Sequence, residues 1–160
     1  MQSKLITSAL AGMVLLAAAC GGSSSTSSAS PSPSPVATGT KIAVATNAKL
    51  GSILVDDKGM TVYLWVGDKG KESTCYTSCA TAWPPVLTDG APQAGTGVQA
   101  SLLGTTTRTD GKVEVTYAGH PLYYFVKDKA PGDVTGQGIN GFGALWWVMS
   151  PSGAAIEVKP

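Results

Sequence analysis

The sequence has few charged residues, a single histidine and little cysteine, and these shortages exclude several classes of function. Only 13% of the 160 residues are charged, with 11 Lys and Arg against 10 Asp and Glu. No basic cluster stands out, so we expect no nucleic-acid partner. Because His120 is the only histidine, one chain cannot form a multi-histidine metal site. No hydrolase motif is present either, and we therefore expect no enzyme activity.

A long hydrophobic run is also missing, which excludes an ordinary transmembrane helix. The most apolar segment, residues 5–19, is shorter than the roughly 20 residues that span a bilayer. It follows a short polar start with Lys4 and ends in three alanines before Cys20. These are the features of a cleaved signal peptide. We interpret residues 1–19 as that signal.

Cys20 marks the expected cleavage site. Three small residues precede it and Gly21 and Gly22 follow it, an arrangement that resembles the lipobox of bacterial lipoproteins. The resemblance implies a diacylglycerol on Cys20, further acylation such as palmitate, and the cell membrane as a partner through this anchor. Each buried methylene of such chains contributes about 0.8 kcal/mol to membrane binding. The alternative is an ordinary secretory signal that leaves Cys20 free.

The residues after Cys20 have the composition of a spacer. Residues 20–40 are rich in Ser, Gly, Thr and Ala and contain three Ser-Pro pairs at 30–35. Such a segment buries too little apolar surface to fold, so it predicts a disordered tether. Residues 41–160 then form one folded domain, which the anchor holds outside the cytoplasm.

The two remaining cysteines, Cys75 and Cys79, lie in the folded part. Outside the cytoplasm, an even number of cysteines predicts a disulfide. A redox-active dithiol and a metal-binding pair are the alternatives, although a metal needs more ligands than one histidine adds.

An internal repeat organises the domain. Residues 63–68 read YLWVGD and residues 123–128 read YYFVKD, an offset of 60, while Trp83 aligns with Trp146 at an offset of 63. Two copies of a unit, at about 42–91 and 103–153, follow from this self-similarity. The repeat motif residues are Tyr63, Trp65, Asp68, Tyr123, Phe125 and Asp128.

Short β-branched and aromatic runs between turn residues predict strands in both copies. The expected strands are 42–46, 52–56, 60–66, 86–88, 103–108, 112–117, 121–126, 145–149 and 155–158. One short helix is expected at 76–83, beside the cysteines and ending before Pro84. The predicted fold is all-β, with two pseudo-symmetric antiparallel meander repeats sharing one core.

These motifs occur together in one order. The paired Y-x-[FWY]-x-x-D segments, the C-x-x-x-C at 75–79 with Trp83-Pro84-Pro85, and the G-H-P-L-Y at 119–123 resemble the secreted-repeat lipoproteins of unknown function. That resemblance implies the duplicated architecture and leaves the chemistry open.

The motif residues have two interpretations each. Alternation along a strand puts Tyr63 with Trp65, and Tyr123 with Phe125, on one face; they are either core residues or a platform that stacks on a ligand. Leu64 and Val66, like Tyr124 and Val126, face the other way, so both faces are apolar and we expect the strands to be covered on both sides. Asp68 and Asp128 follow the strands, where a carboxylate accepts backbone N–H groups in a turn. The sharper interpretation of the two aspartates is a general acid and base.

Two classes of function follow. The first is a non-catalytic envelope module that binds a ligand or a protein partner, or has a structural role, without a cofactor. The second is a redox or metal-handling lipoprotein, in which Met60 and His120, at equivalent places in the two copies, bind copper or haem. An enzyme acting on cell-wall material is a weaker third.

Overall fold

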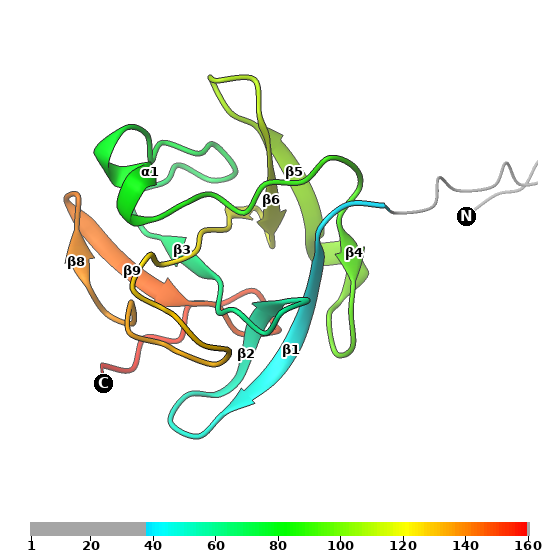
Figure 1. The fold of residues 1–160 in the computed structure, drawn as a ribbon, viewed down its shortest axis with the longest axis vertical. Coiled ribbons are helices and arrows are strands. Elements are labelled where there is room, and N and C mark those ends of the chain that lie inside the picture. Colours follow the sequence, from blue (N-terminus) through cyan, green and yellow to red (C-terminus); the bar gives the residue numbers. More distant parts are fainter. Residues whose placement is uncertain (1–37, 160) are drawn as a thin grey trace, which may run out of the picture. The chain divides into compact units, whose positions relative to one another are not determined.

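The computed structural model describes residues 38–159, which form nine strands, one α-helix and one 3-10 helix (Figure 1). The predicted signal peptide, the lipidation at Cys20 and most of the predicted tether lie outside these residues. The strands are β1 (Lys41–Asn47), β2 (Gly51–Asp56), β3 (Tyr63–Trp65), β4 (Gln93–Ala94), β5 (Leu103–Thr107), β6 (Val113–Tyr117), β7 (His120–Pro121), β8 (Asn140–Gly141) and β9 (Ala144–Val148); the helices are α1 (Ser78–Ala82) and η1 (Ala100–Leu102). Between residues 38 and 159, no helix has the length and apolar character needed to cross a membrane.

The strands pair into three small sheets, in the orders β2-β1-β4, β3-β9-β8 and β5-β6-β7. The hairpins β1–β2 and β5–β6 are antiparallel, as the meander prediction requires. Two pairings differ from that prediction. Strand β3 of the first repeat pairs with β9 of the second repeat. Strand β4 lies parallel to β1, with Lys41 opposite Gln93, because the chain between the two repeats returns to the edge of the first hairpin. The all-β fold with a single short α-helix is confirmed.

Several strands are shorter than predicted. Residues 60–66 form only the three-residue β3, and residues 121–126 contribute only Pro121 to β7. The reason is that the chain changes partners: Tyr123 bridges to both Tyr63 and Pro85, and a proline cannot donate to a continuous ladder. The predicted strands at 86–88 and 155–158 are likewise reduced to isolated bridges, at Leu87 and Ala155.

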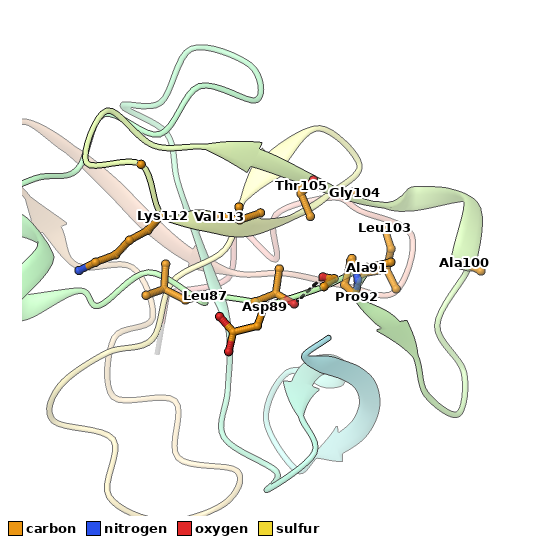
Figure 2. A pocket seen from close by; sticks show the side chains of 13 residues that line it. Leu87, Asp89, Ala91, Pro92, Ala100, Leu103, Gly104, Thr105, Lys112 and Val113 are labelled. Atoms are coloured by element: carbon orange, nitrogen blue, oxygen red, sulfur yellow. Dashed lines mark hydrogen bonds between the residues drawn. The ribbon is translucent and has the colours of Figure 1, made fainter. Parts of the chain in front are cut away.

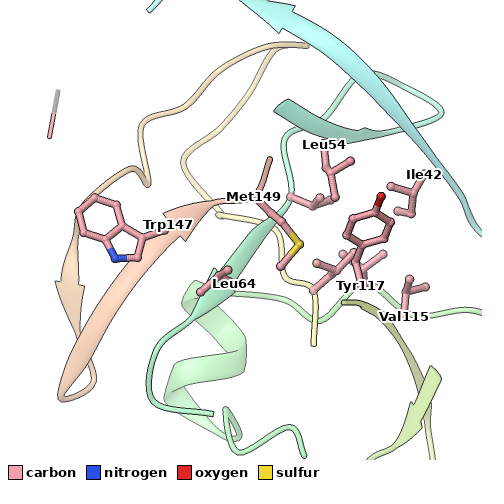
Figure 3. Close-up of a cluster of buried hydrophobic side chains, with 10 residues drawn as sticks. Ile42, Leu54, Leu64, Val115, Tyr117, Trp147 and Met149 are labelled. Carbon is pink, nitrogen blue, oxygen red and sulfur yellow. The ribbon is translucent and has the colours of Figure 1, made fainter. Parts of the chain in front are cut away.

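The buried apolar residues form two clusters, one on each side of the central strands. Strand β9 supplies both, because Trp147 and the following Met149 face the first cluster while Trp146 and Val148 face the second. Figure 3 shows the first cluster, where Trp147, Leu64 and Met149 come from strands of different repeats. Residues of both repeats contribute to each cluster, so the repeats share their core.

The prediction that both faces of the motif strands are covered holds for Tyr63 and Leu64, which are 0% and 4% exposed. It is wrong for Val66 and Val126, which are 55% and 45% exposed. Both valines lie in turns just past the paired residues. In these turns the aspartate N–H donates to the carbonyl of the residue directly before the valine, from Asp68 to Trp65 at 3.2 Å and from Asp128 to Phe125 at 3.1 Å. A side chain in such a turn has no neighbouring strand to cover it.

Candidate functional site

Two tyrosines, Tyr63 and Tyr123, meet at the centre of the domain. Their backbones exchange hydrogen bonds: the N–H of Tyr63 donates to the carbonyl of Tyr123 at 2.8 Å, and the reverse bond is 2.9 Å. Each phenol then donates to the aspartate of the other repeat, from Tyr63 to Asp128 at 2.6 Å and from Tyr123 to Asp68 at 2.7 Å. The motif residues of the two repeats are therefore joined crosswise, in a tyrosine–aspartate exchange.

The second oxygen of each aspartate holds the loop that follows it. Oδ1 of Asp68 accepts from the backbone N–H and the hydroxyl of Thr74, at 2.7 and 2.8 Å. Oδ1 of Asp128 accepts the same two groups of Thr135, the N–H at 3.0 Å. Each aspartate thus receives a backbone N–H, the role expected of a carboxylate just past a strand end. The phenol contacts were not foreseen.

Burial fixes the protonation of the tyrosines. It raises the pKa of both phenols far above the ordinary value, and the hydrogen-bonded aspartates raise it further. The phenols therefore stay protonated and act as donors over the whole physiological range. Burial also raises the pKa of Asp68, although the hydrogen bonds from Tyr123 and Thr74 oppose that shift.

Four aromatic rings form a continuous stack that we call the aromatic stack: Trp65, Trp146, Trp83 and Phe125 in order. The ring centroids are 5.3, 3.9 and 4.2 Å apart, with interplanar angles of 13°, 3° and 26°. Successive rings come from alternate repeats. The equivalent residues Trp83 and Trp146 form the middle of the aromatic stack, and the equivalent residues Trp65 and Phe125 form its two ends. Stacked aromatic pairs are worth about 0.5–1.5 kcal/mol beyond their burial, so this stack joins the repeats strongly.

The paired tyrosines abut the centre of the aromatic stack. Tyr63 meets Trp83 edge-on at 5.3 Å, and Tyr123 meets Trp146 edge-on at 5.2 Å. Gly136 is required here, because a Cβ on it would lie 2.7 Å from the ring of Trp83. Its N–H also reaches the Tyr63 hydroxyl at 3.3 Å. Five of these aromatic residues are buried and belong to the core: Tyr63, Tyr123, Trp83, Trp146 and Phe125. Trp65, at the end of the aromatic stack, is partly exposed.

A buried ion pair adjoins the exchange. Arg108 donates to Oε2 of Glu114 at 2.7 Å, to the carbonyl of Cys75 at 2.7 Å and to the hydroxyl of Ser73. Ser73 in turn bonds the Tyr123 hydroxyl at 2.8 Å. The guanidinium of the second repeat thereby holds the cysteine loop of the first. The sequence does not predict this pair, since nothing in a strand pattern marks a charged residue as buried.

Burial raises the pKa of Glu114 to about 7, against the opposing effect of Arg108. Its Oε1 is buried without a hydrogen-bond partner in the described part of the chain, which agrees with burial as the dominant cause. A carboxyl group whose pKa is higher in the folded than in the unfolded protein binds protons on folding. The contribution of this group to stability is complete at a pH below its pKa in the unfolded protein. It is lost as the pH rises through its pKa in the folded protein.

We therefore expect the free energy of unfolding to fall as the pH rises from about 4.5 to about 7, by on the order of 3 kcal/mol from Glu114. Urea titrations at pH 5 and pH 8 measure this. Glu114→Gln keeps the shape and the acceptor for Arg108 but cannot ionise, so its pH dependence should be weaker. An equally steep dependence in Glu114→Gln would assign the effect to another group.

Cys75 and Cys79 form the predicted disulfide, with Cα atoms 5.2 Å apart. Cys79 lies on α1 and Cys75 in the loop before it, so the bond fastens the helix to the loop that Arg108 holds. The closed ring is small, so the entropic contribution is about 2 kcal/mol or less. Cys75→Ser with Cys79→Ser should lower the free energy of unfolding by no more than this. A loss well above it in urea unfolding would mean that the disulfide shapes the core itself.

Each candidate metal ligand directly follows a glycine with positive φ, Gly59 or Gly119. Met60 follows Gly59 and its N–H donates to Asp56 at 2.8 Å; His120 begins β7 opposite Tyr117. Both are partly buried. Within residues 38–159, no three His, Cys, Asp or Glu side chains gather in a way that could hold a metal ion. The copper or haem site at Met60 and His120 stays a prediction.

A groove opens elsewhere on the domain, with a cavity volume of about 820 Å³. It lies between the chain at 87–92 and the strands β5 and β6, with Leu87 and Val113 among its apolar residues (Figure 2). Asp89 and Lys112 add one charge of each sign. No sequence signal pointed to this groove, because its residues belong to loops and strand edges.

The start of the described chain lies against this groove. The N–H of Gly39 donates to the carbonyl of Ala91 at 3.0 Å, and the Thr40 hydroxyl donates to the carbonyl of Leu87 at 2.7 Å. Ala91 and Leu87 both line the groove. The segment that enters the domain therefore runs along the same surface.

The crosswise contacts identify two copies of one unit, and the comparison with known families gives the same two copies. One family pattern matches the chain twice, at residues 44–87 and 104–150. The two matches cover more than half of the chain and include every motif residue. The chain belongs to this family, described as a secreted repeat of unknown function. Comparison with curated proteins and with solved structures gives no match. A secreted family agrees with the extracytoplasmic location expected from the sequence.

Proposed function

We propose that this member of the secreted-repeat family is a lipid-anchored, non-catalytic module that binds a component of the cell envelope in the groove. The groove at Leu87 and Val113, beside the first described residues, is the observation that carries the proposal. One acidic and one basic residue at its rim favour a ligand without strong net charge.

The hydrogen bonds that the two motif aspartates already accept within the domain support a non-catalytic role. Asp68 and Asp128 each accept bonds from a phenol and from a threonine. An acid and base pair needs carboxyl groups that reach a substrate. Here their oxygens hold the two repeats and their loops in place.

Anchoring through Cys20 is tested on protein from its native membrane. The mature chain should enter the detergent phase, and its N-terminal peptide should carry the mass of a diacylglycerol. Cys20→Ser should remove both properties while residues 38–159 keep their fold. A mature chain with an unmodified cysteine in the aqueous phase would refute the anchor.

Binding in the groove is tested by photo-cross-linking in intact cells. A benzophenone amino acid replaces Val113, which is 37% exposed in the groove, or Val66, which is 55% exposed elsewhere. We expect a discrete adduct from position 113, lost when Leu87→Asp alters the groove, and none from position 66. No adduct at 113, or the same adducts at both positions, would refute the groove as the binding site.

A further inference from the structure

The aromatic stack and the paired tyrosines have a chemical arrangement that packing alone does not require. Trp65 is partly exposed at one end of the aromatic stack, whereas the two central indoles are 3.9 Å apart and fully enclosed. Each central indole meets one tyrosine edge-on, at 5.3 and 5.2 Å. Oxidisable rings therefore run in van der Waals proximity from the surface to both phenols.

We propose that this aromatic stack carries a one-electron oxidation from Trp65 to Tyr63 and Tyr123, where Asp128 and Asp68 take the phenolic protons. This activity is separate from ligand binding in the groove and does not depend on it. The oxidant is an external one-electron acceptor of the oxidising envelope, such as a small inorganic radical.

The oxidant takes one electron from Trp65 and is itself reduced by one electron, leaving an indole radical cation. Electrons move outward along the aromatic stack, from Trp146 and then Trp83, until a tyrosine supplies the last one. When Tyr63 does so, its O–H bond breaks and the proton passes to Oδ2 of Asp128. The products are a neutral phenoxyl radical and a neutral carboxylic acid.

The hydrogen bonds decide where the oxidation ends. A positively charged indole loses its N–H proton only to a base, and in residues 38–159 no carboxylate accepts from the indole N–H of Trp65 or Trp146. The Trp65 N–H is buried without a partner among the described residues, and the Trp146 N–H donates to the carbonyl of Gly141 at 3.1 Å. The phenols, by contrast, donate to carboxylates at 2.6 and 2.7 Å, within the range for direct proton transfer.

The local charge favours the same end point. In residues 38–159, the salt bridges all involve Arg108 or Asp110, so neither Asp68 nor Asp128 is paired with a cation. Asp128 is only 6% exposed. A carboxylate in a poorly solvated site attracts a positive charge more strongly than one in water. Transfer of a proton to it removes a buried charge while the phenoxyl radical stays neutral.

Pulse radiolysis tests the proposal on the mature chain in detergent micelles, with azide radicals as the oxidant. We expect the absorption of the indole radical cation to decay as the phenoxyl absorption rises, in a first-order step whose rate is independent of protein concentration and slower in D2O. Tyr63→Phe with Tyr123→Phe should abolish that phenoxyl signal and leave the indole radical cation longer-lived. Tyr117→Phe is the matched control, because its hydroxyl donates to the carbonyl of Pro151 at 2.8 Å and not to a carboxylate; it should leave the signal unchanged.

Two further variants separate the relay from a structural role. Trp146→Phe keeps a packed ring but is hard to oxidise, so it should slow the appearance of the phenoxyl radical. Asp68→Asn with Asp128→Asn keeps an acceptor for each phenol but not a base, and should remove the phenoxyl signal. Circular dichroism confirms that each variant is folded. Phenoxyl kinetics that are the same in these variants as in the wild type, or that depend on protein concentration, would overturn the proposal.

Discussion

Replacing Trp146 with alanine is expected to lower the free energy of unfolding by about 3–5 kcal/mol, the usual cost of removing a large buried ring and leaving a cavity. Trp146 is 0% exposed and contacts three other rings: Trp65, Trp83 and Tyr123. Its removal therefore breaks the aromatic stack between the two repeats and exposes the paired tyrosines to a void. Urea unfolding measures the loss.

The matched control is Phe142→Ala, which removes an aromatic ring that is 49% exposed. Surface substitutions usually change stability by no more than about 0.5 kcal/mol. Trp146→Phe should lose less than Trp146→Ala because a ring still fills the site. Equal, small losses for Trp146→Ala and Phe142→Ala would mean that the aromatic stack does not hold the repeats together.

The second large effect concerns the buried ion pair. Arg108→Met should lower the free energy of unfolding at pH 8 by about 3–5 kcal/mol, because it leaves the carboxylate of Glu114 buried and unpaired. The loss should be smaller at pH 5, where a carboxyl group with a pKa raised to about 7 is protonated. The pH dependence distinguishes a charge effect from the loss of the bonds to Ser73 and Cys75.

A double variant completes this test. Arg108→Met with Glu114→Leu removes both charges and should recover most of the loss, since well-packed apolar residues often replace a buried ion pair without destabilisation. A double variant as unstable as Arg108→Met alone, with no difference between pH 5 and pH 8, would show that the hydrogen bonds of Arg108 and not its charge fix the cysteine loop.

Much of the fold could be read from the sequence because its signals are local. The repeat offsets and the hairpins depend on spacing and turn residues, and the disulfide of Cys75 and Cys79 follows from the number of cysteines; all are confirmed. The lengths of the later strands could not be read in this way. They depend on Tyr123 pairing with Tyr63 and Pro85 at once, a tertiary choice between partners that alternation along one strand does not encode.

The partners of the motif residues were also beyond the sequence. The offset of 60 shows that Tyr63 and Tyr123 are equivalent, but it does not show whether each phenol meets the aspartate of its own repeat or of the other. The register of the two central backbones decides this, and that register is set by packing across the repeats. The sequence also does not show that Glu114 is buried while its neighbour Val113 is exposed, because this too depends on packing across the repeats.

The tyrosine–aspartate exchange is the central claim, and a set of double-mutant cycles tests it most directly. Tyr→Phe and Asp→Asn are combined for the crosswise pairs, Tyr63 with Asp128 and Tyr123 with Asp68, and for one same-repeat pair, Tyr63 with Asp68. Urea unfolding should give coupling energies of about 1–3 kcal/mol for each crosswise pair, as expected for buried bonds to a charged acceptor. The same-repeat pair should show a clearly weaker coupling. Coupling confined to the same-repeat pair, or absent from all three pairs, would contradict the exchange.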